Sequence, residues 1–311
     1  MALVTALLDI ILTSEFFFSI LRVSTPIIFA AMGMVVANNA GIPNLALEGT
    51  MLISAFLGML VGSFTNSAAA GLMGALLGGI ACAGLLAFFT LRYRANVVLG
   101  GIAINVLASG GTVFFLYLYT GDKGTSASIA GVTLPHIDIP VLKSIPVLGA
   151  VFSGHHILTY IALLSAAFVY VFLKHTPMGF HLRAVGENPD AARSVGINTV
   201  RVKTLALLIS GLLAGMGGAF MSMGYVSWFA RDMIAGRGWI AIAAEAMGRS
   251  TVIGTFLTSL LFGAADAFSN AAGTMGMPSE LVRTIPYCAT LLGLILFSVR
   301  AYRKGKTSSS L

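Results

Sequence analysis

The feature that most constrains the fold is the length of the stretches that carry no charge. Residues 49–91 contain no Asp, Glu, Lys or Arg, and neither do residues 23–47, 95–121 and 204–230. A helix needs about 20 mainly apolar residues to cross the hydrocarbon core of a bilayer. The longest run therefore holds two crossings, and we place the break between them at residues 63–67, Ser-Phe-Thr-Asn-Ser.

Charged residues make up only 9% of the chain, against roughly 25% in soluble domains. Such a chain cannot cover a soluble surface, so lipid must be its main solvent. We expect membrane segments near residues 17–37, 44–64, 68–91, 98–119, 157–174, 204–226, 238–248, 251–267 and 284–299. The piece at 238–248 is too short to span and is expected to be a broken or re-entrant helix. The predicted fold is an all-α bundle of about eight to ten membrane helices, forming one domain over residues 1–311.

Small residues and cysteines fit the same picture. Three glycine pairs have GxxxG spacing, and general helix packing explains them better than a dedicated dimer motif. These pairs are Gly58/Gly62, Gly74/Gly78 and Gly211/Gly215. Cys82 and Cys288 lie in apolar runs and indicate neither a disulfide framework nor a metal site.

Basic residues in short loops mark the cytoplasmic side of a membrane protein. Twelve of the 18 fall on one face: Arg92, Arg94, Lys174, Arg183, Arg193, Arg201, Lys203, Arg249, Arg300, Arg303, Lys304 and Lys306. Residues 175–203 are thus expected to be a cytoplasmic loop, 300–311 a cytoplasmic tail and 120–156 an external loop. The net charge of +7 then reflects topology in the cytoplasmic (inner) membrane and implies no nucleic-acid partner. His155 and His156 are expected to begin a helix, where adjacent side chains point in different directions, so no metal site is predicted.

The expected cytoplasmic loop contains the signals of a short helix. Asn188 is a good N-cap, Pro189 fits the first helical position, and Gly196 fits the left-handed position that ends a helix. The predicted helix has about seven residues and is too short to be stable alone in water, so something must pack against it. The alternative is an ordinary loop lying on the membrane surface.

The run Arg-Ala-Val-Gly-Glu-Asn-Pro at 183–189, followed by Gly196 and Ile197, resembles the cytoplasmic loop of ABC importer permeases. The closest resemblance is to the branched-chain amino acid, simple sugar and nucleoside permease family. Residues 203–219 and 236–249 continue it, and it covers about residues 25–300. In that family the loop is a coupling helix that docks on a separate ATPase. The resemblance implies docking by Arg183, Gly186, Glu187, Asn188, Pro189, Ala192 and Gly196.

Polar residues interrupt the first long apolar stretch beside the helix breakers Gly41 and Pro43. Broken backbone at membrane depth persists only where protein buries it or water lines it, and an ionisable residue there is a functional candidate. The candidate translocation-path residues are Asn38, Asn39, Asn44, Glu48 and Asn105. Asn44 is expected to cap the following helix. Glu48 has an equal alternative, stabilisation of the positive end of a helix, and for Asn105 a buried structural hydrogen bond is favoured.

The string Asn-Leu-Ala-Leu-Glu-Gly at 44–49 resembles the nucleoside branch of the family, although Pro43 and Glu245 depart from its pattern. The resemblance implies import of a nucleoside or nucleobase. Alternatives are a simple sugar or branched-chain amino acid permease, or a secondary transporter that works without ATP. The implied partners are an ATP-binding cassette ATPase, a second permease (a paralogue, or else an identical copy), an external substrate-binding protein and lipid.

The sequence predicts no enzymatic centre. Gly305-Lys306-Thr307 has the end of a phosphate-binding loop, but Arg300 stands where its first glycine is required. No His-x-x-x-His or HExxH pattern is present. We therefore expect no cofactor on this chain, with ATP and Mg²⁺ held by the partner ATPase.

Overall fold

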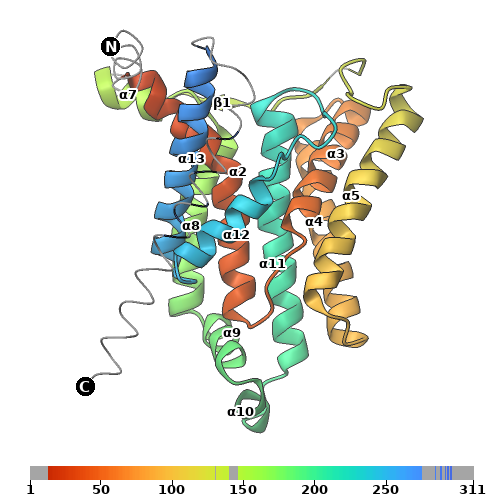
Figure 1. Cartoon of the computed structure of the whole chain (residues 1–311), viewed down its shortest axis with the longest axis vertical. Helices are drawn as coiled ribbons and strands as arrows, with labels where there is room; N and C mark the ends of the chain where they lie inside the picture. Colours follow the sequence, from red (N-terminus) through yellow and green to blue (C-terminus); the bar gives the residue numbers. More distant parts are fainter. Residues whose placement is uncertain are drawn as a thin grey trace.

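The computed structural model describes residues 13–129, 131–139 and 146–274, together with the single positions Thr284, Cys288, Leu291, Gly293 and Ile295. The chain is almost entirely helical in these ranges (Figure 1). Seven helices are long and apolar enough to cross a membrane, which confirms the predicted all-α membrane bundle. They are α2 (Ser14–Asn39), α3 (Leu47–Thr65), α4 (Ala68–Ala87) continued by the π-helical turn η1 (Phe88–Arg92), α5 (Val97–Thr120), α8 (Ile157–His175), α11 (Thr199–Phe220) continued by η2 (Met221–Tyr225), and α13 (Val252–Thr274).

Shorter elements complete the described part of the chain. They are α7 (Pro146–Phe152), α9 (Pro177–Glu187), α10 (Pro189–Ser194), α12 (Arg237–Met247) and the antiparallel strands β1 (His136–Ile137) and β2 (His155–His156). The predicted segment 238–248 corresponds to α12. The predicted segment 284–299 and the tail 300–311 lie outside the described residues, apart from the five single positions.

His155 and His156 lie at the start of α8, as predicted, and His156 is the N-cap of this helix. The sequence did not predict that they also pair with Ile137 and His136 in the small sheet. The strand pairing satisfies backbone groups that a helix start would leave without intrahelical partners.

Helix α2 forms the centre of the bundle. Every residue from Val23 to Ala37 is buried, and α2 contacts α8, α11, α12 and α13. A Cβ atom at Gly33 would lie 2.8 Å from the carbonyl oxygen of Ser210, so this glycine lets α2 and α11 approach closely. Because lipid supplies no hydrophobic drive between helices, such close contacts stabilise the bundle.

The break predicted at 63–67 lies between α3 and α4. Asn66 adopts a left-handed conformation with φ of 48°, and the Ser67 hydroxyl accepts a hydrogen bond from the amide of Ala70. The glycine pairs pack within the chain, since a Cβ at Gly74 would contact Val61 of α3. This agrees with general helix packing.

Two segments inside the bundle are not helical. Residues 40–46 run from the end of α2 to the start of α3, and residues 226–236 run from η2 to α12. Helix α12 has 11 residues and is about 16 Å long at 1.5 Å per residue, roughly half of a hydrocarbon core. It packs against α2, α3 and α13 (Figure 1).

The bundle has two distinct ends. Helices α9 and α10 project from one end, and α7, β1 and the link after α5 lie at the other (Figure 1). We call these the α10 end and the sheet end.

Candidate functional site

Helix α10 has the boundaries that its capping residues require. The Asn188 side-chain oxygen accepts hydrogen bonds from the amides of Asp190 and Ala191, at 3.1 and 3.0 Å, and Pro189 occupies the first helical position. Gly196 follows the helix with φ of 87°. The predicted short helix is thus confirmed, with six residues.

The seven residues assigned to docking divide by exposure. Glu187, Asn188 and Gly196 are exposed, whereas Ala192 is buried. Arg183, Gly186 and Pro189 are half-buried, and the Arg183 guanidinium lies 5.0 Å from the centre of the Phe180 ring. Of the seven, Glu187, Asn188 and Gly196 therefore contribute most to the exposed surface, and their role in docking stays a prediction.

Gly186 faces inward. A Cβ atom there would collide with the carbonyl oxygen of Asn39 and would lie 3.2 Å from the amide nitrogen of Gly41. Gly41 has φ of 67°, in the left-handed region that favours glycine. Backbone thus packs directly on backbone, and α9 touches the chain where α2 ends and the non-helical segment 40–46 begins.

Glu48 binds the start of the half-length helix α12. Its two carboxylate oxygens accept hydrogen bonds from the amides of Gly236 and Gly238, both at 2.8 Å. A carboxylate is stabilising at the positive end of a helix, where amides lack intrahelical acceptors. Glu48 therefore stabilises the positive end of a helix, which is one of the two roles considered for it. That helix is α12, whereas Glu48 itself belongs to α3.

Asn38 and Asn39 bind residues at the end of α12 and in the turn that follows it. The Asn38 side chain donates to Glu245 Oε1 at 2.8 Å and to the hydroxyl of Ser250 at 2.9 Å. The Asn39 amide donates to the carbonyl of Ser250 at 3.1 Å. These bonds tie the end of α2 to the turn between α12 and α13.

Asn44 and Asn105 fix the segment between α2 and α3. Asn44 donates to the hydroxyl of Ser210 at 3.0 Å and accepts from the amide of Ala46, so it forms a local turn. The prediction that Asn44 caps α3 was wrong, because the N-cap position of α3 is Ala46. Asn105 donates to the carbonyl of Leu45 at 3.0 Å and accepts from the amide of Gly49 at 2.8 Å, which is the favoured structural hydrogen bond.

The five polar residues thus form a scaffold that joins α2, α3, α5, α11 and α12. A role of these residues in solute passage stays a prediction.

A family model described as branched-chain amino acid transport system, permease component, matches residues 16–299. The chain belongs to this permease family.

Two relatives of the permease are 33% identical over 293 residues, which cover 89% of this chain and 90% of each relative. They are the nucleoside ABC transporter permease protein NupC of Lactococcus lactis and the guanosine ABC transporter permease protein NupQ of Bacillus subtilis. A solved inward-facing putative metal-chelate type ABC transporter agrees in fold, with a TM-score of 0.53 at 17% identity over 94% of this chain and 88% of that one. The permease is therefore a transport component and not an enzyme.

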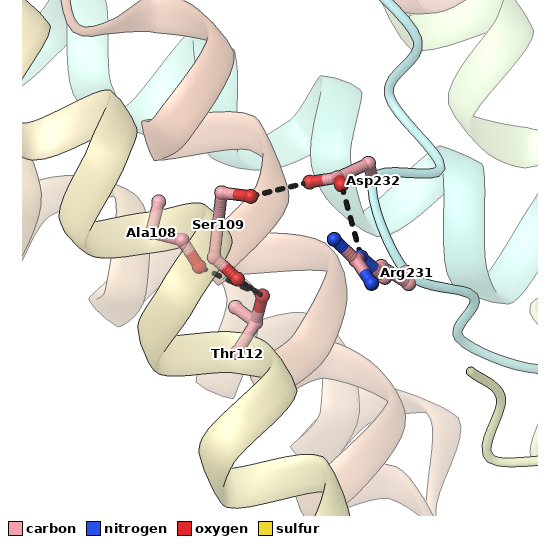
Figure 2. A network of polar contacts seen from close by, with 5 residues as sticks. All are labelled: Ala108, Ser109, Thr112, Arg231 and Asp232. Atoms are coloured by element: carbon pink, nitrogen blue, oxygen red, sulfur yellow. Dashed lines mark hydrogen bonds and ion pairs between the residues drawn. The ribbon is translucent and has the colours of Figure 1, made fainter. Parts of the chain in front are cut away.

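Two ion pairs of the permease were not assigned from the sequence. Arg237 of α12 bonds to Asp266 of α13 at 3.1 Å, and both side chains are largely buried. Arg231 and Asp232 lie 3.4 Å apart in the segment 226–236, and Asp232 accepts a hydrogen bond from Ser109 of α5 at 2.7 Å (Figure 2). The signal in the sequence is three charges, at 231, 232 and 237, between two apolar helices.

At the sheet end the permease has a cavity of about 370 Å³ whose lining includes Arg22, His136, His155, His156 and Trp228. Burial lowers the pKa of His156 to about 4, and it also lowers the pKa of His155. Both imidazoles are therefore neutral at pH 7. In the described part of the chain, no group of three or more His, Cys, Asp or Glu side chains has the geometry to hold a metal ion.

Proposed function

We propose that this permease is half of the membrane-spanning part of an ABC importer that carries a nucleoside or nucleobase into the cytoplasm. The proposal rests on two relatives whose names specify nucleosides and guanosine. It also rests on the string Asn-Leu-Ala-Leu-Glu-Gly at 44–49. In this proposal residues 1–311 form one transport domain that contains half of the passage.

The observation that carries the proposal is the placement of α10. It is a capped six-residue helix that projects from the bundle, with Glu187 and Asn188 exposed beside it. A helix this short is not stable by itself. We assign it, with the end of α9, as the coupling surface on which the ATPase docks.

The distribution of basic residues supports an orientation of the permease in the membrane. Arg94 lies in a link at the α10 end, and Arg92, Lys174, Arg193 and Arg201 lie in α10 or in the helical turns that meet that end. Basic residues in short loops favour the cytoplasmic side. We therefore place the α10 end and the C-terminus in the cytoplasm, and residues 120–156 outside.

The remaining parts of the importer are separate chains. Two ATPase subunits would hold ATP and Mg²⁺, and a second permease, paralogous or identical, would form the other half of the passage. A substrate-binding protein would deliver the solute at the sheet end. This chain itself would need no cofactor.

The packing offers a route from the ATPase into the bundle. A shift of α10 would move α9, and Gly186 would pass the shift to Asn39 and Gly41 through their backbone contact. The segment 40–46 leads to Glu48, whose carboxylate holds the start of α12. Both non-helical segments would thus respond to one movement.

Co-purification and uptake test the proposal. The permease is extracted from native membranes in mild detergent, and its partners are identified by mass spectrometry. We expect a stoichiometric ATPase and a second permease. Uptake of labelled nucleosides should require the ATPase and should compete with nucleosides but not with glucose or leucine. A homo-oligomer without an ATPase in several detergents would refute the importer and favour a secondary transporter.

A further inference from the structure

One ion pair of the permease lies on the outside of the bundle at membrane depth. The side chains of Arg231 and Asp232 are 63% and 51% exposed. Ser109, which donates to Asp232, is the thirteenth of the 24 residues of α5. At 1.5 Å per residue it lies about 18 Å from the start of that helix. The carboxylate therefore sits beside the middle of a spanning helix (Figure 2).

Lipid is a poor environment for this group. Charged side chains within membrane segments almost always face the bundle interior or a water-filled cavity, because hydrocarbon does not solvate them. The Arg237–Asp266 pair meets this requirement by burial, with exposures of only 13% and 16%. The Arg231–Asp232 pair is open on this chain, so in the membrane it must face water or another protein and not lipid.

The turn that carries the pair is fixed at both ends. Ala230 forms a backbone bridge with Thr125, and the Arg231 amide donates to the carbonyl of Gly124 at 2.8 Å. At the other end, the Gly236 amide donates to Glu48. Asp232 itself has φ of 50°, a left-handed conformation that costs energy for a non-glycine residue. The surrounding bonds thus hold Asp232 in one position.

Space is available beside Asp232. Gly110 follows Ser109, and a Cβ atom there would meet nothing within 4 Å. The two Asp232 oxygens together accept about four hydrogen bonds, of which Ser109 and Arg231 supply two. Acceptor capacity therefore remains for hydroxyl groups.

We infer that Ser109, Arg231 and Asp232 line the aqueous passage and bind the sugar hydroxyls of the solute as it crosses. The inference rests on the proposed function, because a nucleoside supplies vicinal hydroxyls that a carboxylate accepts. The second permease subunit forms the opposite wall. The residues that contact the solute thus lie on the outer flank of this chain. Glu48 holds the end of the segment that carries them through the amide of Gly236.

Thiol accessibility tests the inference. With both native cysteines replaced by alanine, Ser109→Cys is treated in intact cells with a negatively charged, membrane-impermeant methanethiosulfonate. The control is Leu107→Cys, two residues away on the opposite flank and 58% exposed. We expect Ser109→Cys to react roughly ten times faster, because hydrocarbon excludes the charged reagent. Arg231→Cys is a second variant that leaves Ser109 in place, and it should react as fast.

Solute protection and kinetics complete the test. Millimolar nucleoside should slow the labelling of Ser109→Cys, and Asp232→Asn should raise the KM of uptake with little change in maximal rate. Equal slow labelling at 107, 109 and 231 would refute an aqueous location. Transport of a nucleoside without protection would refute solute contact. Labelling requires neither an ATPase nor a known solute, so the proposed function and this inference fail separately.

Discussion

At the residue scale, Glu48 has the most demanding environment. Its carboxylate is an acceptor for two amides that begin a helix inside the bundle. We predict that Glu48→Leu destabilises the permease by roughly 1–3 kcal/mol for each amide left without a partner. Glu48→Gln should have an intermediate effect, since one acceptor oxygen remains. Thermal unfolding in detergent measures both, with the exposed Glu15→Gln as the control. A Glu48→Leu variant that melts like the wild type would contradict this assignment.

His156 predicts a pH dependence. Its pKa is about 4 in the folded chain and 6.5 in the unfolded chain, so the unfolded chain binds the proton more readily. Stability should therefore fall as pH decreases from 6.5 towards 4. At pH 5 the loss is about 2 kcal/mol, from 1.36 kcal/mol per pH unit.

The measurement is the melting temperature at pH 7.5 and at pH 5. Carboxyl groups and His155 also contribute to the wild-type change, so the informative quantity is the difference between wild type and His156→Gln. The variant should lose less stability on acidification. His181→Gln, at an exposed position of α9, serves as the control and should behave like the wild type.

At the element scale, the contact of α9 with the end of α2 is sensitive to a single methyl group. Gly186→Ala would push a Cβ atom into the Asn39 carbonyl. We predict a destabilisation of about 1–3 kcal/mol from overpacking, together with reduced uptake. Ala184→Leu, at an exposed position of the same helix, adds more volume and should leave both unchanged. Normal uptake by Gly186→Ala would show that this contact does not transmit motion.

The exposed end of α9 should tolerate substitution without unfolding. We predict that Glu187→Lys leaves the melting temperature unchanged but abolishes uptake while ATP hydrolysis continues, because like charges at an interface are unfavourable. Uptake and hydrolysis are measured in parallel. Glu15→Lys, at the sheet end, is the matched charge reversal. Unchanged uptake by Glu187→Lys would remove the coupling assignment.

Most elements were predictable because their signals are local. Uncharged runs located the spanning helices, and Asn188, Pro189 and Gly196 located α10. Helix α13 extends to Thr274, beyond the predicted end at 267. Long-range partners were not predictable: Glu48 and Gly236 are 188 positions apart, and β1 meets β2 across a loop.

At the scale of the whole molecule, the permease is a spanning bundle with two non-helical segments, one directly before α3 and one directly before α12. Hydrogen bonds made by Asn44, Glu48 and Asn105 hold these segments. The sequence identified these side chains as polar residues at membrane depth. It did not show that they bind backbone, because their partners come from distant helices.

During synthesis, Glu48 leaves the ribosome 188 residues before Gly236. In that interval α3 can enter the membrane, but the amides that its carboxylate binds do not yet exist. The start of α3 must therefore stay in water, or be shielded by the insertion machinery, until α12 has been made. The N-terminal helices can assemble early, but the bundle closes only when the last quarter of the chain arrives. A chain truncated before residue 236 should accordingly be removed by membrane proteases even though it contains six of the seven long helices found in the described ranges.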